Sequence, residues 1–209
     1  MARQADHNER RKLFAAAALA VIARDGLEGL TMRVVAKEAG FTTGALTHYF
    51  QSKDELLIAA SEAGADVVRP EMDDAATGAS ARAALRDLLY TVLPTSPAMK
   101  AQWRFWMAFW ERAAHSPQVQ RVMRERYFEY TNRVATVIRR SQEQGETPPG
   151  VDAEKVAREI IALIDGIGVQ VMIGSRRFTN AVQRQYVDDL LEMRLGPVRE
   201  APRRKRASM

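Results

Sequence analysis

Cysteine is absent from the 209-residue sequence, and histidine occurs only three times. The absence of cysteine excludes disulfide bonds, thiolate metal sites and a cysteine nucleophile, and it favours a cytoplasmic protein. His7, His48 and His115 are scattered, and none stands in the Glu-x-x-His or His-x-x-x-His spacing of a helical metal site. The sequence therefore predicts no metal, no cofactor and no enzymatic activity.

The sequence also lacks a long apolar run and a secretory signal. Its most apolar stretch, residues 160–174, contains Asp165 and Gln170 and is shorter than the ~18 residues of a membrane-spanning helix. The opening residues, MARQAD, have no apolar core with a small-residue cleavage site. We therefore expect no membrane association. Asp165 could be a perturbed acid, but a polar interface contact is favoured over a catalytic role.

Strict alternation of apolar and polar residues, the pattern of a strand, is missing as well. Apolar residues instead recur three or four positions apart, and we expect an all-α fold of about nine helices. Their approximate ranges are residues 9–24, 31–39, 43–50, 52–68, 81–93, 97–114, 117–144, 152–174 and 180–195. Thr31, Ser52, Ser96 and Asp152 are expected to cap helices, and Pro70 is expected to end the fourth one.

The helices divide into an N-terminal head and a longer body. We expect a helix-turn-helix DNA-binding domain over residues 1–58, a helical ligand-sensing and dimerisation domain over 59–195, and a basic tail over 196–209. Residues 194–209 carry a net charge of +5, which equals that of the whole chain, so net charge does not locate a nucleic-acid site. The run Arg203–Arg206 is expected to be disordered, and a specific DNA clamp is the lesser alternative.

Residues 31–50 have the pattern of a helix-turn-helix. This motif needs a small residue where its helices cross, a glycine in the turn and an apolar anchor on the second helix. Ala36, Gly40 and Leu46 fill these positions. The second helix would enter the major groove while the first crosses the phosphate backbone. A helical bundle that merely contains a tight turn is the alternative, and this spacing alone would not exclude it.

The outer face of the second helix of the motif carries small or polar side chains, which suit contacts to base edges. They are Thr42, Thr43, Ala45, Thr47 and His48. The surrounding residues that could hold phosphate oxygens are Thr31, Arg33, Tyr49 and Lys53, to which Arg10 and Arg11 could add backbone contacts. The first set would read sequence, and the second would position the protein.

The run TMRVVAKEAGFTTGALTHYFQSKDELL, residues 31–57, resembles the DNA-binding head of TetR-family transcriptional regulators. The similarity covers residues 9–58 and implies DNA contacts from Thr31, Arg33, Thr42, Thr43, Ala45, His48, Tyr49 and Lys53. Thr47 departs from the tyrosine of many members, and its surroundings resemble the BetI-type branch of choline-responsive repressors. WMAFW at 106–110 and LIDGI at 163–167 are similar to the C-terminal domain of that branch.

Aromatic residues make up only 7% of the chain, yet five of them lie between residues 103 and 110. Aromatic walls suit apolar or quaternary ammonium ligands, and the resemblance implies an inducer pocket in the body. The expected pocket residues are Tyr90, Trp103, Trp106, Phe109, Trp110, Tyr127 and Tyr130. Filling of the core is the alternative, and it is favoured for most individual rings.

The eighth expected helix is apolar almost all round, and its glycines permit close approach of another helix. Together with the ninth helix it resembles the family's dimer interface, to which each subunit contributes two helices. The expected interface residues are Ile160, Ile164, Ile167, Gly168, Val171, Tyr186 and Leu190. Burial within a single chain is the alternative.

These features predict a TetR-type repressor that binds a near-palindromic operator as a homodimer and is released by a small-molecule inducer. Its expected partners are double-stranded operator DNA, a second copy of the chain and an inducer of unknown identity. Activation rather than repression is one alternative. Another is an architectural DNA-binding protein that needs no ligand, although the uncharged reading face argues against it.

Overall fold

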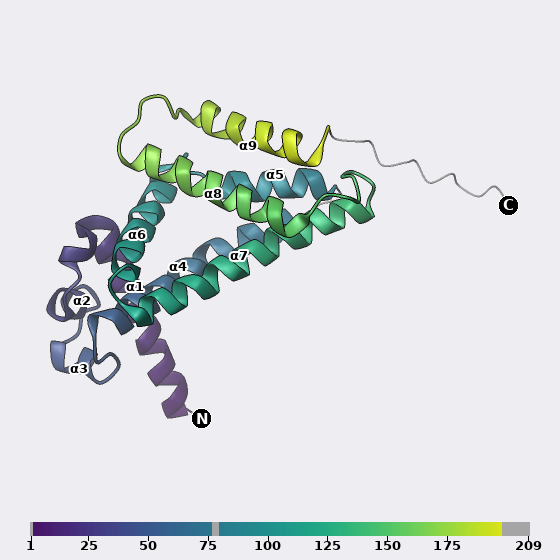
Figure 1. Ribbon diagram of the computed structural model, residues 1–209. Helices are drawn as coiled ribbons and strands as arrows, with labels where there is room; N and C mark the ends of the chain where they lie inside the picture. The colour runs from purple at the N-terminus through teal and green to yellow at the C-terminus, as the bar shows by residue number, and fades with distance from the viewer. Residues whose placement is uncertain (1, 77–79, 198–209) are drawn as a thin grey trace. The chain divides into compact units, whose positions relative to one another are not determined.

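The computed structural model describes residues 2–76 and 80–197, and within these ranges the chain forms nine helices and no strand (Figure 1). The helices are α1 (Ala2–Gly29), α2 (Met32–Glu38), α3 (Thr43–Thr47), α4 (Lys53–Ala76), α5 (Ala81–Thr91), α6 (Pro97–Ala113), α7 (Pro117–Glu143), α8 (Ala153–Met172) and α9 (Asn180–Leu195). The predicted all-α class is confirmed for these residues. The basic run Arg203–Arg206 lies outside them.

Side-chain caps begin several helices at the predicted residues. The hydroxyl of Thr31 accepts a hydrogen bond from a backbone N–H of α2 at 3.2 Å, and Ser96 does the same for α6 at 3.1 Å. The carboxylate of Asp152 accepts from a backbone N–H of α8 at 2.9 Å. Each cap satisfies a donor that the first turn of a helix leaves without an acceptor.

α4 begins as predicted but ends later. The hydroxyl of Ser52 accepts from the N–H of Glu55 at 3.1 Å, and the carboxylate of Glu55 reaches back to the N–H of Gln51 at 2.8 Å. The predicted end at Pro70 is wrong, because α4 continues through Pro70 to Ala76. An interior proline removes one backbone hydrogen bond and its ring clashes with the preceding turn, which disfavours a helix but does not always end it.

α1 also differs from its predicted range. It starts at Ala2 rather than near Glu9, and it kinks at Gly26, whose φ of 72° and ψ of −171° are not helical. The helix predicted to end at residue 24 therefore continues past this kink to Gly29.

Two compact units are distinguished, each made of two stretches of chain. The first comprises the chain up to Pro70 together with Pro94–Arg126, and the second comprises Glu71–Leu93 together with the chain from Tyr127 onward. α4 and α7 each contribute to both units. The predicted division into residues 1–58, 59–195 and 196–209 is a functional one and stays a prediction.

The first unit holds the helix-turn-helix. α1 packs against α2 and α6, and α2 packs against α3 (Figure 1). Phe14, Leu46 and Phe50 have no exposed surface, and the Phe14 ring lies 5.2 Å from the ring of Phe41. Burial of each such side chain contributes about 1.5–3 kcal/mol, which fixes α2 and α3 on α1.

The second unit contains the helices that were predicted to form a dimer. α9 packs against α5 and α8 (Figure 1). The buried Arg82 of α5 donates through Nη2 to the carbonyl oxygens of Leu191 and Gly196, at 3.1 Å each, and so ties α5 to the end of α9. Burial lowers the pKa of this guanidinium. No helix in the described part of the chain is long and apolar enough to cross a membrane.

Candidate functional site

The turn between α2 and α3 has the geometry that a helix-turn-helix requires. Gly40 has a φ of 78°, its N–H donates to the carbonyl of Lys37 at 3.1 Å, and the N–H of Phe41 donates to the carbonyl of Ala36 at 2.8 Å. This pair of bonds is a Schellman motif, which needs a left-handed residue after the helix. Ala36 and Leu46 are buried, so all three predicted positions of the motif take their expected places.

The predicted base-reading residues lie on and beside α3. Thr42 caps the helix, because its hydroxyl accepts from the N–H of Ala45 at 3.2 Å, and His48 ends it. The side chains of Thr42, Thr43, Thr47 and His48 are exposed, whereas that of Ala45 is half-buried. The arrangement leaves an outer face with hydroxyl groups, an imidazole and a methyl group, and without large aliphatic side chains.

The predicted phosphate-contact residues lie on the elements around this face. Thr31 caps α2, Arg33 follows in its first turn, and Lys53 begins α4. All three are exposed, whereas Tyr49 is half-buried. The eight residues predicted to contact DNA therefore all belong to the first unit, on or next to α2, α3 and the start of α4.

Residues of α1 surround Tyr49, and the sequence reasoning did not find this. The ring of His7 lies 4.5 Å from the ring of Tyr49, and the ring of Phe14 lies 5.4 Å from it on α1 as well. Arg11 donates through Nη1 to the carbonyl of Tyr49 at 3.0 Å, and its guanidinium lies 4.4 Å from the centroid of Phe50. The available signal was the spacing of His7, Arg11 and Phe14, which places them on one side of a helix.

A charged cluster anchors the helix that follows the head. Asp54, in the first turn of α4, accepts from Arg112 Nε at 2.6 Å and Nη2 at 2.9 Å, and from the hydroxyl of Ser116 at 2.7 Å. The hydrogen bond from Arg112 holds the pKa of Asp54 below its usual range. Arg112 lies near the end of α6, and Ser116 precedes α7.

The predicted pocket residues fall into two groups. Trp103, Trp106, Phe109 and Trp110 lie on α6 in the first unit, and Tyr90, Tyr127 and Tyr130 lie in the second. Trp103 and Phe109 are buried, and Trp106 and Trp110 are half-buried. The rings of Trp103 and Trp110 stand edge to face, with their centroids 5.9 Å apart. Their role in a pocket stays a prediction.

Two tyrosines of the second unit donate to carboxylates. Tyr127 donates to Asp165 of α8 at 2.6 Å, and Tyr90 donates to Asp188 of α9 at 2.7 Å. Burial raises the pKa of Asp165, although the bond from Tyr127 opposes that shift. Burial and the bond to Asp188 raise the pKa of Tyr90 to about 12.

The predicted dimer residues differ in how far they are exposed. Ile160, Ile164, Ile167 and Gly168 are buried in the chain, Val171 and Leu190 are half-buried, and Tyr186 is 48% exposed. Large apolar side chains also stand exposed at Ile173 (66%) and Met193 (75%). Small residues occupy the exposed positions Ala162 and Gly166 of α8.

Comparison with known proteins matches most of the chain. The family described as "BetI-type transcriptional repressor, C-terminal" matches residues 81–196, and the one described as "Bacterial regulatory proteins, tetR family" matches residues 15–60. The HTH-type transcriptional regulator PksA of Bacillus subtilis (strain 168) is 30% identical over 174 residues, 83% of each chain. The HTH-type transcriptional regulator BetI of Ectopseudomonas mendocina is 26% identical over 197 residues, 91% of this chain and 95% of its own.

Solved structures extend the similarity to the fold. A putative transcriptional regulator from Saccharomonospora viridis, solved in complex with choline, is 27% identical with a TM-score of 0.80, over 92% of this chain and 100% of that one. A transcriptional regulator from Rhodococcus sp. Rha1 is 27% identical with a TM-score of 0.79, over 92% and 99% of the two chains. The resemblance thus covers the body as well as the head.

Proposed function

The chain belongs to the TetR family of transcriptional regulators, and on this premise we propose that it represses transcription from a near-palindromic operator, which it binds as a homodimer and leaves when a small molecule binds its body. Like its relatives it is a regulator and not an enzyme. A repressor of bacterial promoters acts on chromosomal DNA, and the cytoplasm is therefore its proposed location.

The exposed face of α3 carries this proposal. Thr43 and His48 stand outward after the tight turn at Gly40, where they can meet base edges in a major groove. Thr31, Arg33 and Lys53 flank that face with groups that can hold phosphate oxygens. We therefore assign base reading to Thr42, Thr43, Ala45 and His48, and backbone contacts to Thr31, Arg33, Tyr49 and Lys53.

The proposed dimer uses α8 and α9 of each chain. A partner can reach the exposed stripe of Ala162, Gly166, Ile173, Tyr186 and Met193, whose small residues on α8 permit close helix approach. Of the predicted residues, Val171 and Leu190 are half-buried and remain partly open to a partner, whereas Ile160, Ile164, Ile167 and Gly168 are buried within the chain. Two-fold pairing of two heads requires an operator with two half-sites.

Inducer contacts are proposed for two groups of aromatic residues, each within its own unit: Trp103, Trp106, Phe109 and Trp110 of the first unit, and Tyr90, Tyr127 and Tyr130 of the second. The relative from Saccharomonospora viridis was solved with choline, which makes a quaternary ammonium ligand one candidate class. The guanidinium of Arg126 already lies 5.6 Å from the centroid of Trp106, however, so a cation does not approach that ring face unopposed.

An architectural DNA-binding protein is the second candidate function. It would hold phosphates and DNA shape, and it would show equal affinity for all duplexes with a steep salt dependence. The uncharged residues at the centre of the α3 face favour the sequence-specific regulator instead.

Replacing single side chains of the head tests this proposal. Thr43→Ala and His48→Ala should each weaken binding to the preferred duplex by about 1–3 kcal/mol, because base contacts discriminate between sequences by about that amount. Binding to a random duplex should change little. Lys53→Ala should weaken both duplexes alike. Fluorescence anisotropy at fixed salt measures the affinities, and equal losses on both duplexes for all three variants would show that the reading face is misassigned.

The sign of regulation needs a separate measurement. Deleting the gene should raise expression of a reporter placed behind the operator, and an inducer should weaken operator binding in vitro. A fall in reporter expression, together with ligand-strengthened DNA binding, would identify an activator.

A further inference from the structure

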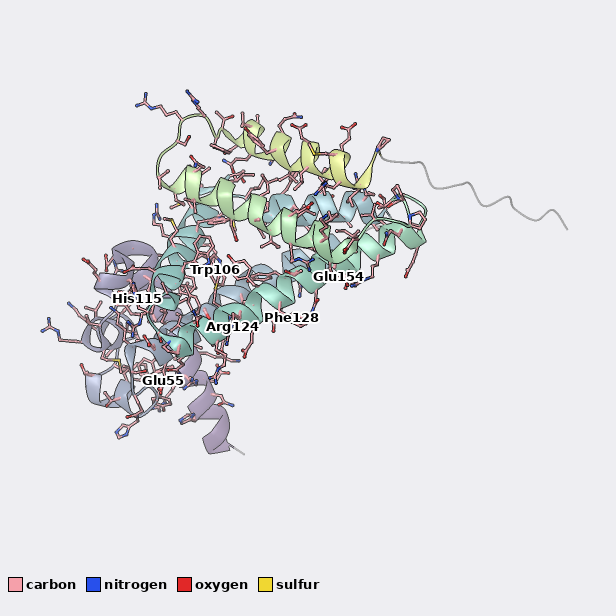
Figure 2. The ribbon with its side chains drawn as sticks, viewed as in Figure 1. Glu55, Trp106, His115, Arg124, Phe128 and Glu154 are labelled. Carbon is pink, nitrogen blue, oxygen red and sulfur yellow. The ribbon has the colours of Figure 1, made fainter. Side chains whose placement is uncertain are left out.

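One stripe of α6 carries three polar aromatic or amide side chains. Gln102, Trp106 and Trp110 are four residues apart, which places them on the same side of the helix. Trp106 is labelled on α6 in Figure 2, and each of the three is half-buried. Gly64 of α4 faces this stripe closely, because a Cβ at that position would come within 2.9 Å of Gln102 Nε2.

Arg126, on α7, lies against this stripe of α6. It is only 9% exposed, its guanidinium carbon lies 5.6 Å from the centroid of Trp106, and its Nη2 donates to the hydroxyl of Ser61 at 3.0 Å. The stripe of Gln102, Trp106, Trp110 and Arg126 therefore holds a desolvated positive charge against an aromatic surface. All of these residues belong to the first unit.

Three buried hydrogen-bond donors at this stripe have no acceptor. Gln102 Nε2, Trp110 Nε1 and Arg126 Nε are all enclosed without a hydrogen-bond partner. Buried donors are ordinarily paired with protein, water or a ligand, because an unpaired donor has lost its water without replacement. Three such donors, two on α6 and one on α7, call for a molecule that supplies acceptor oxygens.

We propose that this stripe binds the carboxylate of a small amphipathic acid, and the proposal rests on the sensor role given to the body under the proposed function. A carboxylate offers about four acceptor sites and a negative charge, which match Arg126 and the two neutral donors. The apolar part of the acid would pack on the rings of Trp106 and Trp110. A quaternary ammonium group has no acceptor and would meet the charge of Arg126.

Thermal unfolding and calorimetric titration of the full-length protein, without DNA, test this ligand class. The probes are straight-chain and aromatic monocarboxylates, each paired with the trimethylammonium compound of similar size, and choline. At least one acid should raise the Tm, and the matched cations should not. Arg126→Met should lower the affinity for that acid by about tenfold or more, which corresponds to the free energy of one charge-assisted hydrogen bond.

Two further variants guard against a simple folding defect. Gln102→Leu removes an unpaired donor and keeps the charge of Arg126. It should therefore lower the affinity for the acid and leave the Tm of the free protein unchanged or raised. Arg124→Met removes an exposed arginine of the same helix, two residues away, and should change neither property (Figure 2).

The proposal is overturned if no acid in the set binds. It is also overturned if choline binds and the Arg126→Met variant binds choline with the same affinity as the unaltered protein. Operator release is then measured separately with the acid that binds. An acid that binds through Arg126 without changing operator affinity would support the site and contradict the inducer role, so the two failures are distinguishable.

Discussion

Asp54 is the residue whose charge holds the start of α4 to Arg112 at the end of α6 and to Ser116 before α7. Its carboxylate accepts hydrogen bonds from Arg112 and from Ser116, and the bonds from Arg112 depress its pKa. A depressed pKa stabilises the fold above the pKa that the aspartate has when unfolded, about 3.9. That stabilisation is lost as pH falls through the lower pKa of the folded state.

Asp54→Asn should therefore lower the free energy of unfolding at pH 7. As the pH is lowered below 5, the free energy of unfolding should fall less in this variant than in the unaltered protein, as measured by urea unfolding at several pH values. Glu154→Gln is the control, because Glu154 pairs with Arg139 at an exposed site where ion pairs contribute little (Figure 2). Equal pH dependence in the Asp54→Asn variant and the unaltered protein would contradict this role.

His7 should act on DNA binding through Tyr49. His7→Ala should weaken the preferred duplex about twofold to tenfold, the range expected for loss of an aromatic pair, whereas His7→Phe should retain the affinity because it keeps a ring against Tyr49. Fluorescence anisotropy measures both variants. His115→Ala alters another exposed histidine, and it should leave the affinity unchanged (Figure 2). A loss in His7→Phe as large as in His7→Ala would show that His7 does not act through its ring contact with Tyr49.

At this scale the sequence predicts exposure better than contact. Thr43 and His48 are exposed on α3 as expected, because helical spacing and the turn at Gly40 determine which side faces out. The ring contact between His7 and Tyr49 joins positions far apart in the chain, and no local pattern specifies such a pair. Arg11 was named as a residue that could add a DNA backbone contact, and this stays a prediction; the pattern did not predict that its guanidinium contacts Tyr49 and Phe50 within the head.

The α2–α3 turn is the element on which the head depends. Gly40→Ala should lower the free energy of unfolding by about 1–2 kcal/mol, because a side chain disfavours its left-handed φ of 78°. Urea unfolding measures the change. Gly150→Ala is the matched control, since Gly150 lies in a loop, a Cβ there would meet nothing within 4 Å, and its φ is not left-handed. Equal stability of the two variants would mean that the turn tolerates other backbone geometry.

The positions of helices can be predicted from apolar periodicity and capping residues. Their ends cannot always be predicted from helix-breaking residues such as proline. Thr31, Ser96 and Asp152 begin their helices as predicted, because a cap acts locally on the first turn. Pro70 fails to end α4, because whether an interior proline ends a helix is a balance between its lost backbone bond and steric clash and the stability of the rest of the helix. That balance depends on contacts that a local pattern does not contain.

The whole molecule is proposed to be a two-fold dimer through α8 and α9. Met193→Glu places a charge in the exposed stripe and should shift the protein from dimer to monomer, which sedimentation velocity measures at several concentrations. Phe128→Glu makes the same kind of change on α7, at a side chain 69% exposed, and should leave the dimer intact (Figure 2). A dimer unaffected by Met193→Glu would exclude the stripe as its interface.

Apolar pattern alone does not separate an interface from a core. Ile160, Ile164 and Ile167 were predicted to meet a partner, yet they are buried within the chain, while Tyr186 and Met193 stand exposed. Both environments select the same apolar residues, so only the packing of the single chain tells which surface is left for a partner.

Selection of bound duplexes from a random DNA pool, with the purified dimer at near-physiological salt and with competitor DNA present, tests the central claim most directly. A sequence-specific dimer predicts enrichment of one inverted repeat, with half-sites spaced by about one helical turn or a multiple of it. A pool that stays random, from protein shown to be folded and dimeric, would contradict the assignment of α3 as a reader of operator sequence.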